Sequence, residues 1–249
     1  AVVLLSATLP YVQRRRLARA WGARGELDAL VPYPLVTHID ADGKPIAFQP
    51  DEAHRPESRS VRVELQVESE GFPGDDICAR ILAAAREGAR VAVICNLVDH
   101  AQRLARLLRT TATDVPVDIF HARYQFCERQ ARELQVQERY GPNATFGGGR
   151  VLVATQVVEQ SLDLDFDWMV TQLCPADLLF QRLGRLHRHE RSRPPGFEQP
   201  VVSVILPKES DFGRHKYIYG NVRVMWRTKE MLMRNAQIDF PAAYRDWIE

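Results

Sequence analysis

The chain has 249 residues, of which 45% are hydrophobic, and its 33 basic and 32 acidic residues leave a formal net charge of +1. This length can bury one large core or two modest ones, and no apolar run is long enough to cross a bilayer, so we expect a soluble protein with no membrane partner. The small net charge excludes a global field that attracts nucleic acid, so any basic surface must be local.

The four cysteines show neither close pairing nor the spacing of metal ligands; they are Cys78, Cys95, Cys127 and Cys174. We expect each to lie in or near the core as a reduced thiol, which predicts a cytoplasmic protein. Nothing at the N-terminus resembles a signal peptide.

The first 59 residues are irregular in pattern. Residues 1–5 form an apolar, strand-like run with no lead-in, as if the sequence were cut there. Residues 11–21 are basic and compatible with a helix, whose arginines form either a solvated face or phosphate contacts. Residues 33–59 are rich in proline and charge, which predicts a connection with a short strand or two.

From residue 61 onward, strand-like and helix-like segments alternate. The pattern predicts helices over residues 75–87, 97–109 and 126–140. It predicts strands over residues 61–67, 91–95, 117–120, 151–154, 168–173 and 201–206. Such an alternation is typical of an α/β domain with a parallel sheet and right-handed crossovers.

Polar residues follow three of the predicted strands, and function gathers at the carboxyl ends of strands in such sheets. Asn96 follows the first, His121 and Arg123 follow the second, and Thr155 and Gln156 follow the third. Small hydroxyl and amide groups there can bind phosphate or sugar oxygens without reading bases. Capping and turn hydrogen bonds are the alternative role for these residues.

An arginine-rich segment follows the strand at residues 168–173. Residues 177–193 carry five arginines and two acids and are predicted to form a helix with a local basic patch. Arg182, Arg185 and Arg188 have i, i+3, i+6 spacing, so on a helix they can converge on one anionic target. A nucleoside triphosphate is such a target.

The sequence ATQVVEQSLDLD followed by QRLGRLHR resembles motifs V and VI of superfamily 2 helicases. The fuller wording, VVEQSLDLD and LLFQRLGRLHRH, resembles the CRISPR-associated helicase-nuclease family of type I systems. In that family ATP lies between two RecA-like domains, and motif VI of the second supplies arginine fingers. The resemblance implies a RecA-like, P-loop NTPase-like second helicase domain without the P-loop, with Gln181 heading motif VI and Arg185 and Arg188 as fingers.

The resemblance also assigns contacts to the nucleic acid strand and to ATP. It places Asn96 in motif IV, Arg123 in the following basic motif, and Thr155 and Gln156 at the start of motif V, all regions that contact the single strand. Asp163 is expected to accept the two ribose hydroxyls of ATP. Asp165 is expected to act as a structural cap or turn.

Three further positions are expected to couple ATP state to movement along the strand. Ser6-Ala7-Thr8 matches motif III, which couples phosphate state to the grip on nucleic acid, so Ser6 and Thr8 are candidates. Glu159 and Gln160 stand where related proteins carry coupling residues. Arg182 is expected either to bind phosphate or to form a surface salt bridge.

The residues that would hold magnesium and the phosphates are missing. Asp51-Glu52-Ala53-His54 spells a helicase magnesium box, but Pro50 precedes it and it follows motif III, so we predict a coincidental match in a loop. No Gly-x-x-x-x-Gly-Lys-Ser/Thr loop occurs. ATP and Mg²⁺ are therefore expected only together with a first RecA-like domain. His187 and His189 lack further ligands at zinc spacing.

These observations predict three regions: the end of a first RecA-like domain and a connection (1–59), the second RecA-like domain (60–210), and a helical lead-in to an accessory domain (211–249). The sequence looks cut at both ends. The resemblance implies a fragment of an ATP-dependent single-stranded DNA translocase that a guide-RNA surveillance complex recruits and that carries its nuclease domain elsewhere. A DExH-type RNA helicase, or a non-catalytic platform that binds a partner, are the alternatives.

Overall fold

The computed structural model describes residues 2–6, 8–29, 31–144, 147–159, 162–208 and 212–248. The chain folds as two compact units, a larger one of Val61–Gln237 and a smaller one of Ala1–Ser60 with Ile238–Glu249. The larger unit thus continues past residue 210, where the sequence predicted the second domain to end. The strand β9 (Gln237–Phe240) contains its C-terminal boundary.

A parallel sheet forms the centre of the larger unit. Its strands are β3 (Arg59–Glu68), β4 (Arg90–Ile94), β5 (Val117–Phe120), β6 (Arg150–Ala154), β7 (Trp168–Gln172) and β8 (Val201–Pro207). These six strands lie in the order β5-β6-β4-β7-β8-β3 and their neighbours pair in parallel, and β9 follows β3 as the seventh strand of the sheet. The predicted α/β fold with a parallel sheet is confirmed.

The strands differ in composition according to their place in the sheet. The central strands β6 and β7 are buried along their whole length and are almost continuously apolar, as expected when both faces are covered. The strand β3 begins with alternating exposed and buried residues, because its outward side chains reach solvent. The sequence pattern therefore reports the position of each strand.

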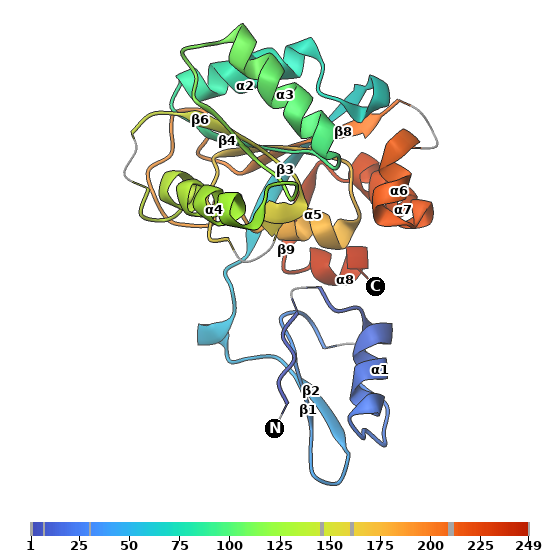
Figure 1. Ribbon diagram of the computed structural model, residues 1–249. Helices are drawn as coiled ribbons and strands as arrows, with labels where there is room; N and C mark the ends of the chain where they lie inside the picture. The colour runs from blue at the N-terminus through green and yellow to red at the C-terminus, as the bar shows by residue number, and fades with distance from the viewer. Residues whose placement is uncertain are drawn as a thin grey trace. The chain divides into compact units, whose positions relative to one another are not determined.

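Helices cover both faces of this sheet (Figure 1). One face packs under α2 (Asp75–Arg86) and α3 (Val98–Thr111), and the other carries α4 (Phe126–Tyr140) and α5 (Ala176–Leu183). The inward stripe of α3 includes Leu104 and Leu108, each 0% exposed. Burying one such leucine stabilises the fold by roughly 1.5–3 kcal/mol. After β8 the chain continues through η4 (Gly213–His215), α6 (Lys216–Tyr219) and α7 (Val222–Arg234).

The smaller unit contains α1 (Tyr11–Ala20), the antiparallel hairpin β1 (Val36–Ile39) and β2 (Pro45–Phe48), η1 (Glu52–His54) and α8 (Ala243–Ile248). The strand predicted over residues 1–5 is wrong, because described residues 2–5 pair with no neighbour and their side chains are 56–92% exposed. The exposed turn η1 contains the false magnesium box and follows no buried strand, which confirms its assignment to a loop.

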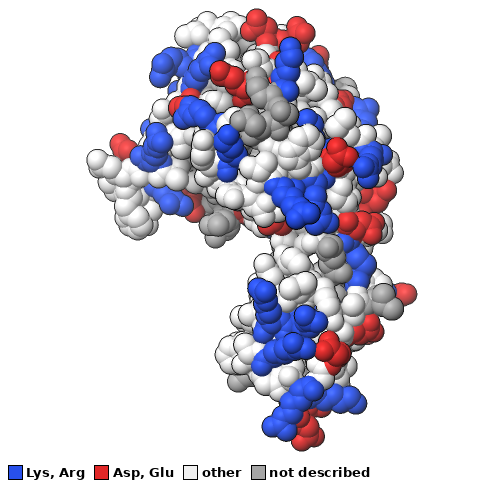
Figure 2. All heavy atoms as spheres, turned by 90° about the vertical axis from the view of Figure 1, so that its right-hand side faces the viewer, with Lys and Arg blue, Asp and Glu red and all other residues white. Residues whose placement is uncertain are grey.

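Charge on the surface is mixed, in agreement with the net charge. Figure 2 shows Lys and Arg side chains interspersed with Asp and Glu rather than merged into one basic field. Three of the cysteines are buried thiols as predicted, whereas Cys127 is exposed near the start of α4, so its predicted place in the core is wrong. Over the described ranges, no helix combines the length and apolarity needed to span a bilayer.

Gly149 allows the turn before β6 to approach the end of α2. A Cβ atom built on it lies 2.0 Å from the Ala85 carbonyl oxygen and 2.7 Å from the Ala89 nitrogen. We expect Gly149→Ala to lower the free energy of unfolding by about 1–3 kcal/mol, because the backbone must shift. Gly147→Ala is the matched control, since its Cβ would meet nothing within 4 Å. Urea denaturation of both variants tests this, and equal stabilities would contradict it.

Candidate functional site

The arginine-rich segment is not a single helix. The helix α5 ends at Leu183, and Leu186 then forms a parallel bridge with Phe166. Phe166 N donates to Arg185 O and His187 N donates to Phe166 O, each at 3.0 Å. These bonds replace helical ones, so the helix predicted over residues 177–193 forms only as far as Leu183, and the predicted single face of arginines is wrong. We call residues 184–189 the arginine loop.

Arg182 is the last arginine on α5, and it is 0% exposed. A guanidinium has five N–H donors, and here Nε makes one hydrogen bond, Nη1 two and Nη2 two. The acceptors are Glu159 Oε1 (2.7 Å), Thr171 Oγ1 (2.6 Å), Gln172 O (3.1 Å), Asn96 Oδ1 (3.2 Å) and Tyr219 Oη (2.9 Å). Phosphate binding and a surface salt bridge, the two expectations for Arg182, are therefore both wrong.

These acceptors come from four segments at the carboxyl edge of the sheet: the turn after β4, η3 (Gln156–Glu159), the end of β7, and α6. Burial lowers the pKa of Arg182, but Cys174, Tyr219 and Glu159 outweigh it and hold that pKa above its usual value. Burial raises the pKa of Glu159 more than Arg182 lowers it. The proton therefore stays on the guanidinium.

The residues predicted to contact a strand differ in exposure. Asn96 is 2% exposed, and its amide donates to Leu173 O (2.8 Å) besides accepting from Arg182. Thr155 is also 2% exposed, and half-buried Gln156 donates to Asn96 O (3.0 Å). Only Arg123 among the four has an exposed side chain. For Asn96 the geometry favours the capping alternative, because its side chain is committed within the protein.

Arg185 and Arg188 extend from the arginine loop and are not sealed inside the unit. Arg185 is half-buried, and its guanidinium donates to the carbonyl oxygens of Val158 and Glu159, both at 3.3 Å. Burial, with a smaller effect of Arg188, lowers the pKa of Arg185. The Arg188 side chain is 39% exposed, and its Nη1 donates to Gly184 O (3.2 Å). Both cations remain accessible at the surface of the larger unit.

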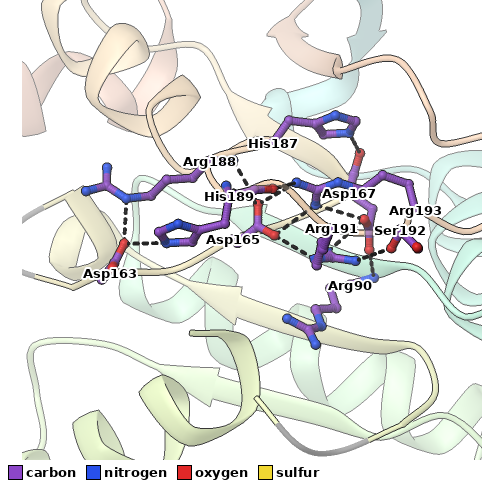
Figure 3. Close-up of polar contacts among 10 residues, drawn as sticks. All are labelled: Arg90, Asp163, Asp165, Asp167, His187, Arg188, His189, Arg191, Ser192 and Arg193. Carbon is purple, nitrogen blue, oxygen red and sulfur yellow. Dashed lines mark hydrogen bonds and ion pairs between the residues drawn. The ribbon is translucent and has the colours of Figure 1, made fainter. Parts of the chain in front are cut away.

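Asp163 pairs with Arg188 instead of standing free (Figure 3). Asp163 Oδ1 accepts from Arg188 Nε (2.5 Å) and contacts His189 Nε2 (2.8 Å). Burial raises the pKa of Asp163, but the hydrogen bonds from His189 and Arg188 outweigh it and hold that pKa below its usual value. Two residues expected to bind different parts of ATP therefore bind each other here.

A buried set of ion pairs lies beside this loop, and little in the sequence indicated it (Figure 3). Asp165 and Asp167 are 1% and 0% exposed and both pair with Arg191 and Arg193, which we call the acid–arginine cluster. The four N–O distances are 2.6–3.1 Å. Asp165 thus has the structural role that we predicted. The regular spacing of Asp163, Asp165 and Asp167 between buried apolar residues was the available signal.

The remaining predicted site residues are placed as follows. Gln181 is half-buried on α5, and the Glu159 carboxylate is committed to Arg182. In the smaller unit, Ser6 Oγ accepts from Thr8 N (3.3 Å). Ala7 and Gln160 lie outside the described residues.

No group of three or more His, Cys, Asp or Glu side chains within the described ranges could hold a metal ion. His187 instead contacts Asp167 O through Nε2 (3.1 Å), and His189 contacts Asp163. The described residues therefore form no cluster of three or more such ligands, as a structural zinc site would need.

The buried guanidinium of Arg182 generates a stability prediction. We expect Arg182→Lys to lower the free energy of unfolding by about 2–5 kcal/mol, because three ammonium donors cannot satisfy five buried acceptors. Arg234→Lys is the control, since its pair with Glu230 on α7 leaves Arg234 75% exposed. Urea denaturation compares the two, and an Arg182→Lys loss no larger than the control's would refute the five-donor argument.

Asp165 generates a pH prediction. Burial raises its pKa, but hydrogen bonds from Arg193 and Arg191 outweigh it, so the folded pKa lies below the ordinary 3.8. The carboxylate therefore contributes stability that is fully present above the unfolded pKa and is lost as pH falls through the folded one. The stability difference between wild type and Asp165→Asn should be constant near neutrality and shrink below about pH 4. Denaturation at pH 7, 5 and 3.5 measures it, and a constant difference would contradict the assignment.

The C-terminal family of the CRISPR-associated nuclease/helicase Cas3 (Cas3-like_C_2) matches residues 87–191 of this chain. That range contains Arg182, the arginine loop and Arg191. The CRISPR-associated endonuclease/helicase Cas3 of Escherichia coli (strain K12) is 46% identical over 258 residues, covering 100% of this chain and 29% of the E. coli protein. The Thermus thermophilus protein of the same name is 34% identical over 258 residues, covering 87% and 27%. The chain thus spans less than a third of these relatives.

Solved structures agree in fold. The crystal structure of T. fusca Cas3 aligns with a TM-score of 0.87 and 29% identity, covering 100% of this chain and 32% of that chain. T. fusca Cas3-ATP gives 0.80 and 30%, covering 93% and 29%. A chain of a CRISPR RNA-guided surveillance complex, pre-nicking, gives 0.83 and 30%, covering 99% and 33%. The chain therefore belongs to the CRISPR-associated nuclease/helicase family, in the part that carries the Cas3-like C-terminal helicase domain.

Proposed function

We propose that the chain is the second motor domain of an ATP-dependent, single-stranded DNA translocase in CRISPR interference. The observation that carries this proposal is that three arginines of the arginine-rich segment pair with buried acids, whereas two lie at the surface. Arg182, Arg191 and Arg193 are neutralised by buried acids, whereas Arg185 and Arg188 extend from a fixed loop at the surface. A loop that presents two cations on a rigid frame suits an anionic substrate that docks from outside.

Arg185 and Arg188 act on the γ-phosphate of ATP as arginine fingers, and Gln181 heads the same motif VI. Their fixed positive charges stabilise the negative charge that develops during phosphoryl transfer, without reorganisation of solvent. This sequence has no phosphate loop, so the triphosphate is held by a first RecA-like domain in the longer protein. Hydrolysis then depends on closure of the two domains. The structure with ATP among the relatives supports nucleotide binding.

ATP must also open the pair between Asp163 and Arg188. The Asp163 carboxylate accepts the ribose hydroxyls, and Arg188 turns toward the phosphates. Asp163 is 48% exposed and Arg188 39% exposed, so separating them leaves neither charge buried. An exposed pair of this kind is worth only about 0–1 kcal/mol, which nucleotide contacts readily replace. Mg²⁺ is held by the first RecA-like domain together with the phosphates of ATP.

The single strand lies along the carboxyl edge of the sheet. Exposed Arg123 binds phosphate, which holds any sequence equally. Asn96, Thr155 and Gln156 contribute by shaping the turns, because their side chains are buried or bonded within the protein. Glu159 couples the two sides: its carboxylate binds Arg182 and its carbonyl oxygen accepts from Arg185. Ser6 and Thr8 of motif III perform the same coupling in the first domain.

The complete protein is recruited by a guide-RNA surveillance complex in the cytoplasm and carries its nuclease domain elsewhere. A relative's chain in a surveillance complex supports this recruitment. A DExH-type RNA helicase is the competing proposal, and stimulation of the ATPase by single-stranded DNA against RNA decides between them. A non-catalytic platform would show no stimulation by either.

In the complete helicase, Arg185→Ala and Arg188→Ala should each lower kcat for DNA-stimulated ATP hydrolysis roughly a thousandfold or more, with a smaller change in KM for ATP. The reason is that the fingers bind the transition state more strongly than the ground state. Arg234→Ala on α7 is the control and should hydrolyse ATP at the wild-type rate. Unchanged turnover in both finger variants would refute the assignment.

A further inference from the structure

The arginine loop is laid against the segment Asp163–Asp167, and this contact fixes the path of its backbone. The parallel bridge between Phe166 and Leu186 lies at the centre of the contact. Asp165 N donates to Tyr140 O at the end of α4 (2.8 Å), so the segment is itself anchored to the core. The loop therefore follows a rigid template.

Within the segment Asp163–Asp167, Asp165 is the residue whose side chain binds the backbone of Arg188, one of the two proposed arginine fingers. Its Oδ1 accepts from Arg188 N (2.8 Å) and more weakly from His189 N (3.5 Å). The carboxylate is 1% exposed, so it cannot reach a nucleotide itself. A hydrogen bond from a backbone N–H to a buried carboxylate is charge-assisted and roughly twice as strong as a neutral one. Asp165 thus acts on ATP only through Arg188.

Arg193 closes the loop from its other end. Its Nη1 and Nη2 bind Asp165 at 2.9 and 3.0 Å, and Nη2 also donates to His189 O (2.6 Å). His187 lies between Arg185 and Arg188 in the sequence and has a φ of +47°, a left-handed backbone conformation that residues other than glycine rarely adopt. Such a strained backbone persists only where surrounding contacts hold it in place. Asp165 and Arg193 provide these contacts through their hydrogen bonds to the backbone of Arg188 and His189.

We infer that Asp165 is a positioning residue for ATP hydrolysis: its carboxylate holds the Arg188 backbone so that the guanidinium meets the γ-phosphate. The inference rests on the proposed role of Arg188. It adds Asp165, a buried residue, to the residues that affect ATP hydrolysis. Asp167 does not share this role. It pairs with the same two arginines and is equally buried, but its Oδ2 accepts from Arg90 N at the start of β4 (2.8 Å), away from the arginine loop.

Asp165→Ala and Asp167→Ala therefore form a matched pair in the complete helicase. Each loses ion pairs with Arg191 and Arg193 and removes an acceptor of backbone N–H groups, those of Arg188 and His189 for Asp165 and that of Arg90 for Asp167, so both lose stability. Asp165→Ala should lower kcat about 10- to 100-fold with KM for ATP nearly unchanged, because displacing a catalytic group by about 1 Å costs on the order of a hundredfold. Asp167→Ala should keep kcat within about threefold of wild type.

Two further measurements separate positioning from folding. ADP with aluminium fluoride mimics the transition state, so Asp165→Ala should weaken its binding about 10- to 100-fold while ADP alone binds as in wild type. In Asp165→Asn the side-chain oxygen can still accept from Arg188 N, so kcat should recover toward wild type although stability stays low. Asp165→Leu and Asp167→Leu, which keep a side chain of similar size but have no acceptor, replace the alanine pair if the latter do not fold.

Equal losses of kcat in the Asp165 and Asp167 variants would overturn the inference, as would wild-type binding of the aluminium fluoride complex by Asp165→Ala. Arg188→Ala is measured in parallel. If Arg188→Ala hydrolyses ATP normally, the proposed finger fails and the inference falls with it. If Arg188→Ala is inactive while the two aspartate variants behave alike, only the positioning role of Asp165 is refuted.

Discussion

The burial of the Arg182 guanidinium is the constraint on which the carboxyl edge of the larger unit depends. A buried cation that loses a partner costs about 3–5 kcal/mol, so every acceptor must stay in place. Those acceptors belong to the turn after β4, to η3, to the end of β7 and to α6. Four segments that are distant in sequence are therefore held in one arrangement, and the arginine loop starts from a fixed point.

Buried acids also decide which arginines of the segment from residue 182 to 193 remain available. Glu159 neutralises Arg182, and Asp165 with Asp167 neutralises Arg191 and Arg193. The two arginines between these anchors lie at the surface, where Arg188 pairs with the exposed Asp163 and Arg185 donates to backbone carbonyl oxygens. This arrangement leaves two guanidinium groups at the surface of a chain whose net charge is only +1. The buried ion pairs hold both ends of this segment in place, and their opposite charges cancel.

Local pattern was sufficient for much of the fold. The helix predicted over residues 126–140 coincides with α4, and the six strands predicted from residue 61 onward were placed within a residue or two, because apolar periodicity and glycine breaks are local signals. The end of α5 could not be predicted in this way, since the backbone of Phe166 competes for the residues that follow Leu183. The burial of Arg182 and Asn96 was missed because their partners come from segments 10 to 123 residues away.

In the proposed function, coupling between a strand and a nucleotide runs through the same polar bonds. Gln156 donates to Asn96 O at one end of η3, and Glu159 O accepts from Arg185 at the other end. The Glu159 side chain meanwhile holds Arg182, which binds Asn96 again. If Arg185 shifts toward a phosphate, its hydrogen bonds to η3 must move or break. If η3 shifts alone, buried polar groups lose their hydrogen-bond partners, at a cost of about 1–3 kcal/mol for each group. The turn after β4 must therefore follow, so movement at one site is transmitted to the other.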